Sequence, residues 1–361
     1  MTEFDISLVT RRATSEERRA RLTNASFGSG FTEHMVSLQW SVSRGWHSGK
    51  VTAYQPLSMD PATVGLHYGQ VVFEGLKAYR TADGRSAVFR PEAHAERFQR
   101  SARRLMMPEL PVATFVRAAE HLVSADADWV PEEPERSLYL RPVLFASETA
   151  LALRPAEEFT FLLFAFVTER FFADARPVTV WADREYVRAS PGGTGAAKCA
   201  GNYAASYAAQ ARAAAQGCDQ VVWLDAQQRR WVEELGGMNI FFVQGKGSAA
   251  QLVTPPSSGT ILPGVTRDTL LTLAATRGWA VEERPVSIDE WCEGCRSGRI
   301  TEVFACGTAA QVSPVGAVRS ADGGWTVGEG KPGPVTLQLA DLLDGIHRGR
   351  RADPHGWMHY V

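Results

Sequence analysis

The sequence predicts two domains of mixed α/β or α+β type, and three observations lead to this prediction. The chain has 361 residues, whereas single hydrophobic cores usually stop growing at about 250–300 residues. Hydrophobic residues make up 45% of the chain and charged residues 22%, as in ordinary globular proteins. Strand-like and helix-like segments follow one another in both halves, which favours sheets covered by helices.

Local patterns predict the elements of the N-terminal half. Alternating or continuous apolar runs predict strands at residues 86–89, 138–141 and 159–167. Helical apolar spacing predicts helices over residues 91–107 and 112–125, the first of which has Pro91 in its first turn.

The segment after these elements predicts a domain boundary, because a short stretch ending in Pro177 precedes a new strand at Val178. We therefore expect a small N-terminal α/β domain at residues 1–172, an interdomain loop at 173–177 and a large C-terminal α/β domain at 178–361.

The C-terminal half repeats the mixture of strands and helices. The alanine-rich stretch at residues 204–215 has high helix propensity and is stopped by Gly217. The predicted strands are 220–224, 240–243 and 300–305, and the predicted helices are 203–216, 267–277 and 335–348.

Charge and hydropathy exclude several classes of protein. The 38 Lys and Arg against 40 Asp and Glu give a net charge of -2, which predicts neither a nucleic-acid partner nor a membrane partner. The longest apolar run, residues 161–167, is far shorter than the about 20 residues of a membrane-spanning helix. The charged N-terminus lacks the apolar stretch of a signal peptide, so we expect a cytoplasmic protein.

Cysteine and glycine motifs predict no metal site and no nucleotide site. The five cysteines are scattered, which favours reduced thiols, and no further ligands accompany Cys292 and Cys295 to complete a zinc site. Only 28 residues follow the glycine pattern that ends at Gly333, and Pro334 comes next, so this pattern predicts a turn.

The most informative segment surrounds Lys198, which lies among glycines and alanines at residues 192–201. A solvated lysine beside a flexible turn is one interpretation. The other is a lysine that forms a Schiff base with an aldehyde such as pyridoxal 5'-phosphate.

A pyridoxal phosphate site also needs a carboxylate for the pyridine nitrogen and donors for the phosphate. Glu233 and Glu234 offer the carboxylate before a predicted strand, although a solvated hairpin edge would explain them as well. Residues 262–268 lead into a helix with Thr266 as its expected N-cap, and residues 302–309 end a strand in a small-residue turn.

The order of these segments resembles the fold-type IV pyridoxal phosphate enzymes, and specifically the actinobacterial branched-chain amino acid aminotransferases. The resemblance covers most of the chain and implies the two-domain architecture of that family. It rests on Phe31-Thr32-Glu33-His34-Met35, Leu66-His67-Tyr68-Gly69, Phe73-Glu74-Gly75-Leu76-Lys77-Ala78-Tyr79-Arg80, Tyr139-Leu140-Arg141-Pro142, Tyr186-Val187-Arg188-Ala189, the Lys198 segment and Gly356-Trp357-Met358.

The resemblance implies a role for each cofactor residue. Lys198 would hold the cofactor as a Schiff base and move the proton between substrate and cofactor, and Glu234 would pair with the pyridine nitrogen. Tyr203 would bind the phenolic oxygen. The residues at the positions of the phosphate site are Arg97, Val265, Thr266 and Thr308.

The resemblance also implies a substrate side. Tyr139 and Arg141 match the pair that meets the side-chain carboxylate of glutamate, and the backbone of Thr308 and Ala309 would bind the α-carboxylate. The walls of the pocket would be Phe31, Tyr68 and Phe73. Family members are dimers whose partner contributes to the pocket, so we expect a homodimer.

The predicted activity is transamination between a branched-chain or related hydrophobic L-amino acid and 2-oxoglutarate. Alternatives on the same fold are a D-amino acid transaminase, an aminodeoxychorismate lyase and a cofactor-free binding protein. Leu153 stands where the family has valine and Phe171 where it has tyrosine, and both belong to the substrate side. These two departures predict a specialised 2-oxo acid, with neutral drift as the other interpretation.

Overall fold

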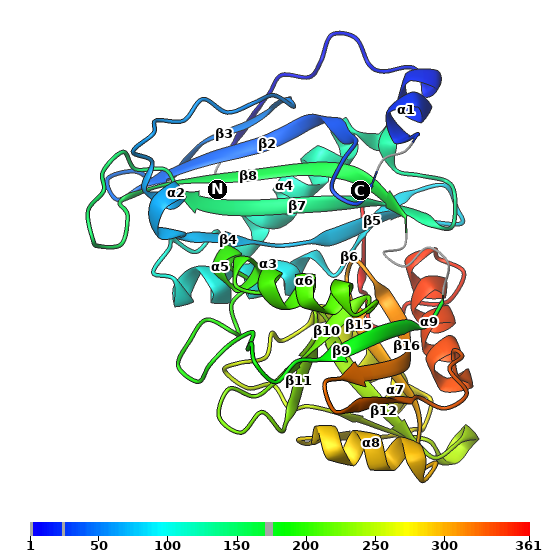
Figure 1. Cartoon of the computed structure of the whole chain (residues 1–361). Coiled ribbons are helices and arrows are strands. Elements are labelled where there is room, and N and C mark those ends of the chain that lie inside the picture. The colour runs from blue at the N-terminus through cyan, green and yellow to red at the C-terminus, as the bar shows by residue number, and fades with distance from the viewer. Residues whose placement is uncertain (1–2, 24–25, 170–175) are drawn as a thin grey trace. The chain divides into compact units, whose positions relative to one another are not determined.

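The computed structural model describes residues 3–23, 26–169 and 176–361 (Figure 1). The chain forms two compact units. The first contains residues 1–171, 197–201 and 345–361, and the second contains residues 172–196 and 202–344. Among the described residues, no helix is both long and apolar enough to cross a membrane.

The units differ from the division of the chain that we expected from the sequence. The segment with Lys198 and the C-terminal segment belong to the first unit, because Cys199 bridges to Val72 and the last strand pairs with residues 87–89. Residues 173–175 of the expected loop lie outside the described residues, and the assignment of the loop stays a prediction.

The first unit is built on a nine-stranded sheet in the order β1-β3-β2-β8-β7-β5-β6-β18, with β4 paired to β7. Its strands pair antiparallel except for β1, which runs parallel to β3. The strands are β1 (Phe4–Ile6), β2 (Phe31–Ser41), β3 (Gly45–Ala53), β4 (Val71–Phe73), β5 (Leu76–Arg80), β6 (Ser86–Phe89), β7 (Arg136–Ala146), β8 (Glu158–Glu169) and β18 (Met358–Tyr360).

Helices α3 and α4 cover one face of this sheet (Figure 1). The core between them is aromatic, since the ring of Phe98 lies 5.6 Å from that of Phe115 and 5.9 Å from that of Phe161. All three side chains are at most 1% exposed. The helices of this part are α1 (Ser15–Leu22), α2 (Val64–Tyr68), α3 (Pro91–Arg104), α4 (Val112–Ala125) and the short 3-10 helix Ala127–Trp129.

The second unit is built on a mixed nine-stranded sheet in the order β11-β10-β9-β16-β15-β12-β13-β14, with β17 paired to β16. Strand β9 runs parallel to both β10 and β16, and β13 runs parallel to β14. The strands are β9 (Val178–Ala182), β10 (Gln220–Leu224), β11 (Val232–Leu235), β12 (Asn239–Gln244), β13 (Gln251–Thr254), β14 (Ala280–Glu283), β15 (Ile300–Gly307), β16 (Gln311–Ser320) and β17 (Gly323–Thr326).

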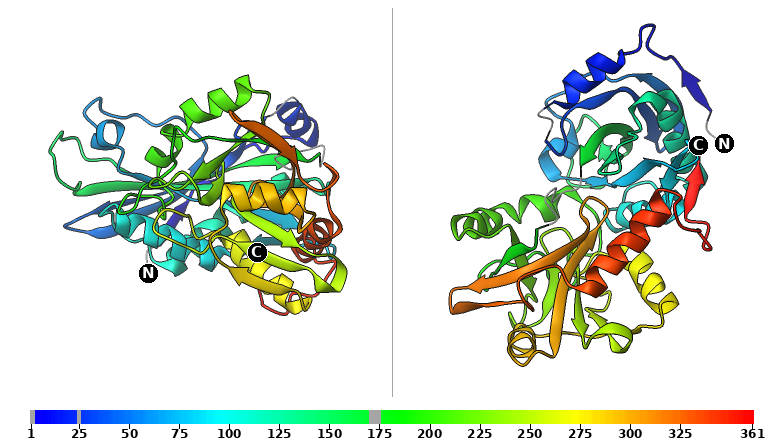
Figure 2. Two further views of the ribbon diagram at one scale, coloured as in Figure 1. Left: turned by 60° about the horizontal axis from the view of Figure 1, so that its bottom comes forward. Right: turned by 90° about the vertical axis from the view of Figure 1, so that its right-hand side faces the viewer.

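Helices α6, α7 and α8 pack against the strands of this second sheet (Figure 2). Trp291 on α8 is fully buried, and its ring lies 5.2 Å from that of Phe242. The remaining helices are α5 (Ala200–Ala204), α6 (Tyr207–Ala215), the 3-10 helix Gly247–Ala249, α7 (Val265–Thr276), α8 (Ile288–Arg296) and α9 (Pro334–His347).

The prediction of mixed α/β or α+β units is confirmed, and most predicted elements are found within a few residues of their expected bounds. The helix expected at 203–216 is an exception, since the structure divides it into α5 and α6. The break follows from Ser206, whose N–H and hydroxyl both donate to the Tyr203 carbonyl over 3.0 and 2.7 Å.

Candidate active site

The residues predicted for the site divide between the two units. Phe171 lies outside the described residues. The first unit carries Phe31, Tyr68, Phe73, Arg97, Tyr139, Arg141, Leu153 and Lys198. The second unit carries Tyr203, Glu234, Val265, Thr266, Thr308 and Ala309.

Lys198 is fixed to the first unit through its backbone. Its N–H donates to Ser101 Oγ over 2.9 Å, and its carbonyl accepts from the Phe73 N–H over 3.0 Å. The backbone of the next residue, Cys199, forms an isolated antiparallel β-bridge with Val72. The Lys198 Nζ lies 4.9 Å from the centre of the Phe73 ring. The backbone of the lysine is therefore immobilised, while its side chain ends above an aromatic ring.

The loop before Lys198 folds through its glycines. Gly192 has a φ of +79°, which favours glycine, and the Gly193 N–H closes a turn onto the Ser190 carbonyl over 2.9 Å. A Cβ on Gly195 would lie only 2.4 Å from the Thr260 carbonyl oxygen and 2.6 Å from the Ala189 Cβ. The small residues that drew attention in the sequence thus allow close backbone packing within the second unit.

Arg97 is 4% exposed and points at Glu74. Its Nε and one terminal nitrogen donate to the two carboxylate oxygens of Glu74 over 2.6 and 2.8 Å. His94 Nδ1 lies 2.9 Å from the same carboxylate. Burial lowers the pKa of His94, and the charges of Arg97 and Lys198 lower it further. Arg97 and Ser101 lie one turn apart on α3. Ser101 binds the backbone of Lys198, and Arg97 binds Glu74, whose neighbour His94 feels the charge of Lys198.

Glu74 is charged in this cluster although it is fully buried. Burial alone would raise the pKa of its carboxyl group, but Arg97 and the hydrogen bond from His94 together lower it below its ordinary value. Since the carboxylate accepts from His94 Nδ1, the neutral form of this histidine carries its proton on Nδ1.

Tyr139 and Arg141 lie beside Phe73 on the first sheet. The Arg141 guanidinium carbon is 5.0 Å from the centre of the Phe73 ring and 5.5 Å from that of Tyr139. Tyr139 stacks on Phe166 at 5.0 Å, and its hydroxyl packs so closely on Gly75 that a Cβ there would lie 1.7 Å away. The Arg141 Nε is buried and has no hydrogen-bond partner among the described residues.

Phe27 is a neighbour of this group that the sequence reasoning missed. Its ring lies edge-on to Tyr139 and to Phe166, at 5.2 Å from each, and 39% of the residue is exposed. In the sequence, this residue could have been noticed only as a single aromatic residue in a segment rich in Ser and Gly. The predicted wall residue Phe31 stacks on Tyr54 at 5.1 Å and contacts Phe166 at 6.0 Å.

Tyr68 and Leu153 lie apart from this group, on the surface of the first unit. Leu153 is 90% exposed and Tyr68 is 50% exposed. The Tyr68 hydroxyl donates to the Leu151 carbonyl over 3.4 Å, so the end of α2 lies beside the loop that carries Leu151 and Leu153. Leu66 on α2 and Leu151 in this loop are also exposed, by 64% and 50%.

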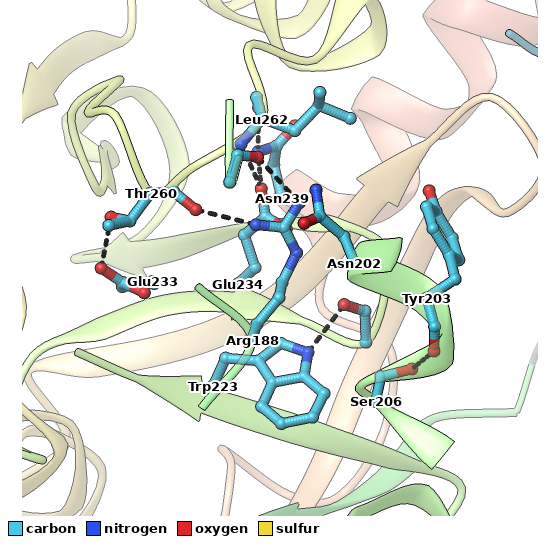
Figure 3. A network of polar contacts seen from close by, with 12 residues as sticks. Arg188, Asn202, Tyr203, Ser206, Trp223, Glu233, Glu234, Asn239, Thr260 and Leu262 are labelled. Atoms are coloured by element: carbon cyan, nitrogen blue, oxygen red, sulfur yellow. Dashed lines mark hydrogen bonds and ion pairs between the residues drawn. The ribbon is translucent and has the colours of Figure 1, made fainter. Parts of the chain in front are cut away.

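Glu234 lies on β11 in the second unit and is 1% exposed. Its Oε1 accepts from the Leu262 N–H over 2.7 Å, and its Oε2 lies 2.8 Å from Arg188 Nε (Figure 3). Asn239 Nδ2 makes a longer contact of 3.5 Å with Oε1 and donates to the Leu262 carbonyl over 3.0 Å. The Leu262 backbone and the Arg188 side chain thus each bind one oxygen of the carboxylate.

Glu233, on the opposite side of the same strand, differs from its neighbour. Burial raises the pKa of its carboxyl group, whereas the hydrogen bond from Thr260 and the charge of Arg188 lower it. The Thr260 hydroxyl donates to Glu233 Oε1 (Figure 3). Of the two carboxylates offered by the sequence, Glu234 is the one that a cation holds directly.

The phosphate residues expected on α7 lie at the start of that helix, but the expected cap is wrong. The N-cap is Gly264, and Thr266 is the second residue of the helix. A Cβ at Gly264 would lie 1.9 Å from Asn239 Oδ1, so a larger residue there would force the Asn239 side chain to move. Val265 and Thr266 are buried at a helix N-terminus, whose amide groups and dipole favour anions.

Two further predicted residues lie in turns of the second unit. Thr308 and Ala309 belong to the turn between β15 and β16, which closes with the pair Gly307 and Gln311. The Tyr203 ring stands over the turn between β11 and β12, since a Cβ on Gly237 would lie 3.8 Å from the Tyr203 hydroxyl.

A family model described as amino-transferase class IV matches residues 71–318 of this chain. The chain belongs to the class IV aminotransferases. It is 54% identical over 358 residues to the branched-chain-amino-acid aminotransferase of Mycolicibacterium smegmatis, covering 99% of this chain and 97% of that protein. It is 52% identical over 358 residues to the enzyme of the same name from Mycobacterium tuberculosis, with the same coverage.

Solved aminotransferase structures share this fold. The branched-chain amino acid aminotransferase of Escherichia coli matches with a TM-score of 0.73 and 27% identity over 90% of this chain and 99% of that chain. The enzyme of the same name from Thermobaculum terrenum, solved in its PLP-form, matches with a TM-score of 0.72 and 25% identity. The match covers 90% of this chain and 97% of that chain. The resemblance to branched-chain aminotransferases inferred from the sequence motifs is confirmed.

Proposed function

We propose that this aminotransferase uses pyridoxal 5'-phosphate to exchange the amino group between a branched-chain L-amino acid and 2-oxoglutarate. The observation that carries the proposal is the surroundings of Lys198, a lysine fixed through both of its backbone polar groups beside Phe73. The names of the relatives support the substrate class, and one solved structure of similar fold is complexed with N-(5'-phosphopyridoxyl)-L-glutamate.

The residues present fit this cofactor. A cofactor with a pyridine nitrogen needs a carboxylate that stays ionised, and Glu234 is a buried carboxylate held by Arg188. A phosphate needs amide donors and a cation, and the start of α7 and Arg97 offer these chemistries. When bound, pyridoxal phosphate supplies an aldehyde that combines with amines and a ring that accepts electrons.

The chain's own residues would then divide the remaining work. Lys198 Nζ would attach the cofactor and afterwards move the proton at the substrate Cα. The Glu234 carboxylate would hold the proton on the pyridine nitrogen, and the Tyr203 hydroxyl would bind the phenolic oxygen. Arg97 and the backbone of Val265 and Thr266 would bind the phosphate.

On the substrate side, Arg141 is the residue suited to a carboxylate. Its Nε is buried and has no partner among the described residues, and a guanidinium binds carboxylates through two parallel hydrogen bonds. Tyr139 lies beside it, and the aromatic rings of Phe27, Phe31 and Phe73 offer apolar contacts for a branched side chain. The backbone at Thr308 and Ala309 would bind the α-carboxylate.

We also propose that the enzyme is a homodimer in which Leu153 reaches the pocket of the partner subunit. The support is the number of large apolar side chains exposed on two neighbouring segments, namely Leu66 and Tyr68 on α2 and Leu151 and Leu153 in the loop that Tyr68 contacts, because exposed apolar residues that gather in one region mark an interaction site. A cytoplasmic location is part of the same proposal.

Lys198→Ala tests the central role. We expect this variant to lose transamination while keeping its fold, because no second lysine of the described residues lies in such a small-residue segment. Turnover would be measured with L-leucine, L-isoleucine or L-valine and 2-oxoglutarate, and folding by thermal melting. Lys246→Ala, at an exposed loop position, is the matched control and should retain full activity. Near-normal turnover and a borohydride-reducible cofactor linkage in Lys198→Ala would contradict the assignment.

The same assay decides the substrate. We expect kcat/KM to be highest for branched-chain 2-oxo acids over aromatic, linear and polar ones. Activity with D-amino acids only, or release of product from aminodeoxychorismate, would favour the two alternative activities of the fold. Absence of cofactor binding would favour a binding protein. A different preferred 2-oxo acid, reversed by Leu153→Val with Phe171→Tyr, would favour the specialised enzyme.

A further inference from the structure

Arg188 lies in a motif that the sequence resemblance singled out without giving it a role. Its side chain is only 7% exposed. Its nitrogens reach three separate parts of the second unit (Figure 3). Nε lies 2.8 Å from Glu234 Oε2, one terminal nitrogen donates to the Thr260 carbonyl over 2.7 Å, and the other donates to the Gly195 carbonyl over 3.1 Å.

These contacts account for how Glu234 can be ionised in a buried place. An isolated carboxylate removed from water is strongly unfavourable, whereas one that is paired with a cation and fully hydrogen-bonded is tolerated. Arg188 supplies the cation at Oε2, and the Leu262 N–H binds Oε1. Each oxygen therefore has a donor that is fixed in direction.

The same guanidinium is also attached to the loop before Lys198. Gly195 is three residues before the lysine in the chain, and its backbone is packed against Thr260 with no space for a side chain. Thr260 accepts from Arg188 through its carbonyl and donates to Glu233 through its hydroxyl. Arg188 therefore connects this loop to the carboxylate through its own side chain.

We propose that Arg188 is a positioning residue of the transamination reaction, which holds Glu234 ionised and aimed and fixes the loop before Lys198 relative to that carboxylate. This inference rests on the proposed function, in which Glu234 faces the pyridine nitrogen. Arg188 acts through Glu234 and is not itself assigned a contact with cofactor or substrate.

The planar guanidinium is needed because three partners lie in three directions. A lysine at this position would keep the charge but offers a single nitrogen on a flexible stem, so it cannot bind all three acceptors in this geometry. A glutamine would remove the charge and leave the Glu234 carboxylate without its cation. The two substitutions therefore separate the effects of geometry and charge.

The experiment compares Arg188→Lys and Arg188→Gln with the wild-type holoenzyme. We expect kcat to fall by about tenfold or more in Arg188→Lys and further in Arg188→Gln, with KM for both substrates within about threefold. The visible absorbance of the bound cofactor should change as well, since it depends on the protonation of the ring nitrogen. Wild-type kcat and an unchanged spectrum in both variants would overturn the proposal.

Arg184→Lys is the matched control. Arg184 lies four residues earlier in the chain, its side chain is 50% exposed, and its acidic neighbours Asp289 and Asp322 are 3.9 and 3.8 Å away. We expect its kcat, KM and spectrum to equal those of the wild type. A loss in Arg184→Lys as large as that in Arg188→Lys would overturn a specific role for Arg188.

A double-variant cycle with Glu234→Gln tests whether Arg188 acts through the carboxylate. If it does, the combined variant Arg188→Gln, Glu234→Gln should have the spectrum and kcat of Glu234→Gln alone. Losses that multiply would overturn the proposal. The double variant also removes both buried charges together, so it gives an answer if Arg188→Gln alone fails to fold.

The outcome is separable from that of the proposed function. A wild-type chain that binds no pyridoxal phosphate or transfers no amino group contradicts the proposed function. A wild-type chain that does both, with variants that behave like it, contradicts only the role of Arg188.

Discussion

Glu233 and Glu234 are adjacent on β11, yet their surroundings make them chemically different. Glu234 is ion-paired with Arg188 and 1% exposed, whereas Glu233 accepts from a threonine hydroxyl and has a raised pKa caused mainly by burial. A carboxylate held by a cation favours a proton on the nitrogen that it faces, while one with a raised pKa takes up a proton more readily.

This difference predicts unequal effects of removing each charge. We expect Glu234→Gln to lower kcat by about 100-fold or more, because an electrostatic contact present in the transition state is lost. The matched variant Glu233→Gln should stay within about tenfold of wild type. Steady-state kinetics of the two holoenzymes check this, and a larger loss in Glu233→Gln would mean that Glu233 is the partner of the ring.

Some residue assignments were accessible from the sequence and others were not. Lys198 and Glu234 stand out because small residues or adjacent acids surround them in the chain. Arg188 and Phe27 do not, because their partners are distant in sequence, as with Arg188 and Glu234, which are 46 residues apart in the chain. The different surroundings of Glu233 and Glu234 depend on Thr260 and Leu262, which no local pattern connects to them.

At the scale of elements, α3 brings the surroundings of the lysine together. His94, Arg97 and Ser101 are spaced by three and four residues, so they share one face of this helix, and all are at most 4% exposed. The sequence predicted the helix, but it did not predict that His94 and Arg97 contact Glu74.

The pH dependence of stability follows from Glu74. Its pKa is lowered in the folded protein, so its ionised form stabilises the fold above the ordinary pKa of 4.5, and this stabilisation is lost as the pH falls below that value. Glu74→Gln removes the carboxylate that pairs with the buried Arg97, and we expect the free energy of unfolding to fall by about 3–5 kcal/mol at pH 7.

The difference in free energy of unfolding between the wild type and Glu74→Gln should therefore become smaller as the pH falls. Denaturant unfolding of both proteins at pH 7 and at lower pH measures it. A difference that stays constant down to pH 3 would show that the charge of Glu74 contributes no stability.

The loop before Lys198 depends on close packing at Gly195. An added methyl group would collide with backbone atoms of Thr260 and with Ala189, so we expect Gly195→Ala to destabilise the protein by about 1–3 kcal/mol and to reduce activity. Gly259→Ala is the control, since a Cβ there meets nothing within 4 Å. Thermal unfolding of both variants provides the measurement, and equal melting temperatures would contradict the packing argument.

At the scale of the whole molecule, the predicted class of fold is confirmed, but the membership of the two units could not be deduced. Periodicity identifies strands without identifying their partners, so nothing in the sequence assigns residues 197–201 or 345–361 to the first unit. Those assignments depend on long-range pairs such as Val72 with Cys199.

The exposed apolar surface leads to a prediction about assembly. We expect a dimer in solution, and we expect Leu66→Glu to shift it toward the monomer, because a charge would be buried without a partner in the interface. Leu337→Glu is the control, since Leu337 is 53% exposed on α9 and lies outside this surface. Light scattering after gel filtration measures both, and a monomeric wild type would contradict the proposed homodimer.

Because the first unit is assembled from three separate segments of the chain, the order of synthesis affects when its sheet can be completed. A ribosome delivers the first unit's main segment before the lysine segment, and β18 after both. The edge of the first sheet at β6 therefore stays unpaired until residues 358–360 are made, and the nascent first unit exposes this strand edge up to that point. A truncation that removes only the last few residues would leave the proposed catalytic residues in place and still yield a chain whose earliest-made sheet is never completed.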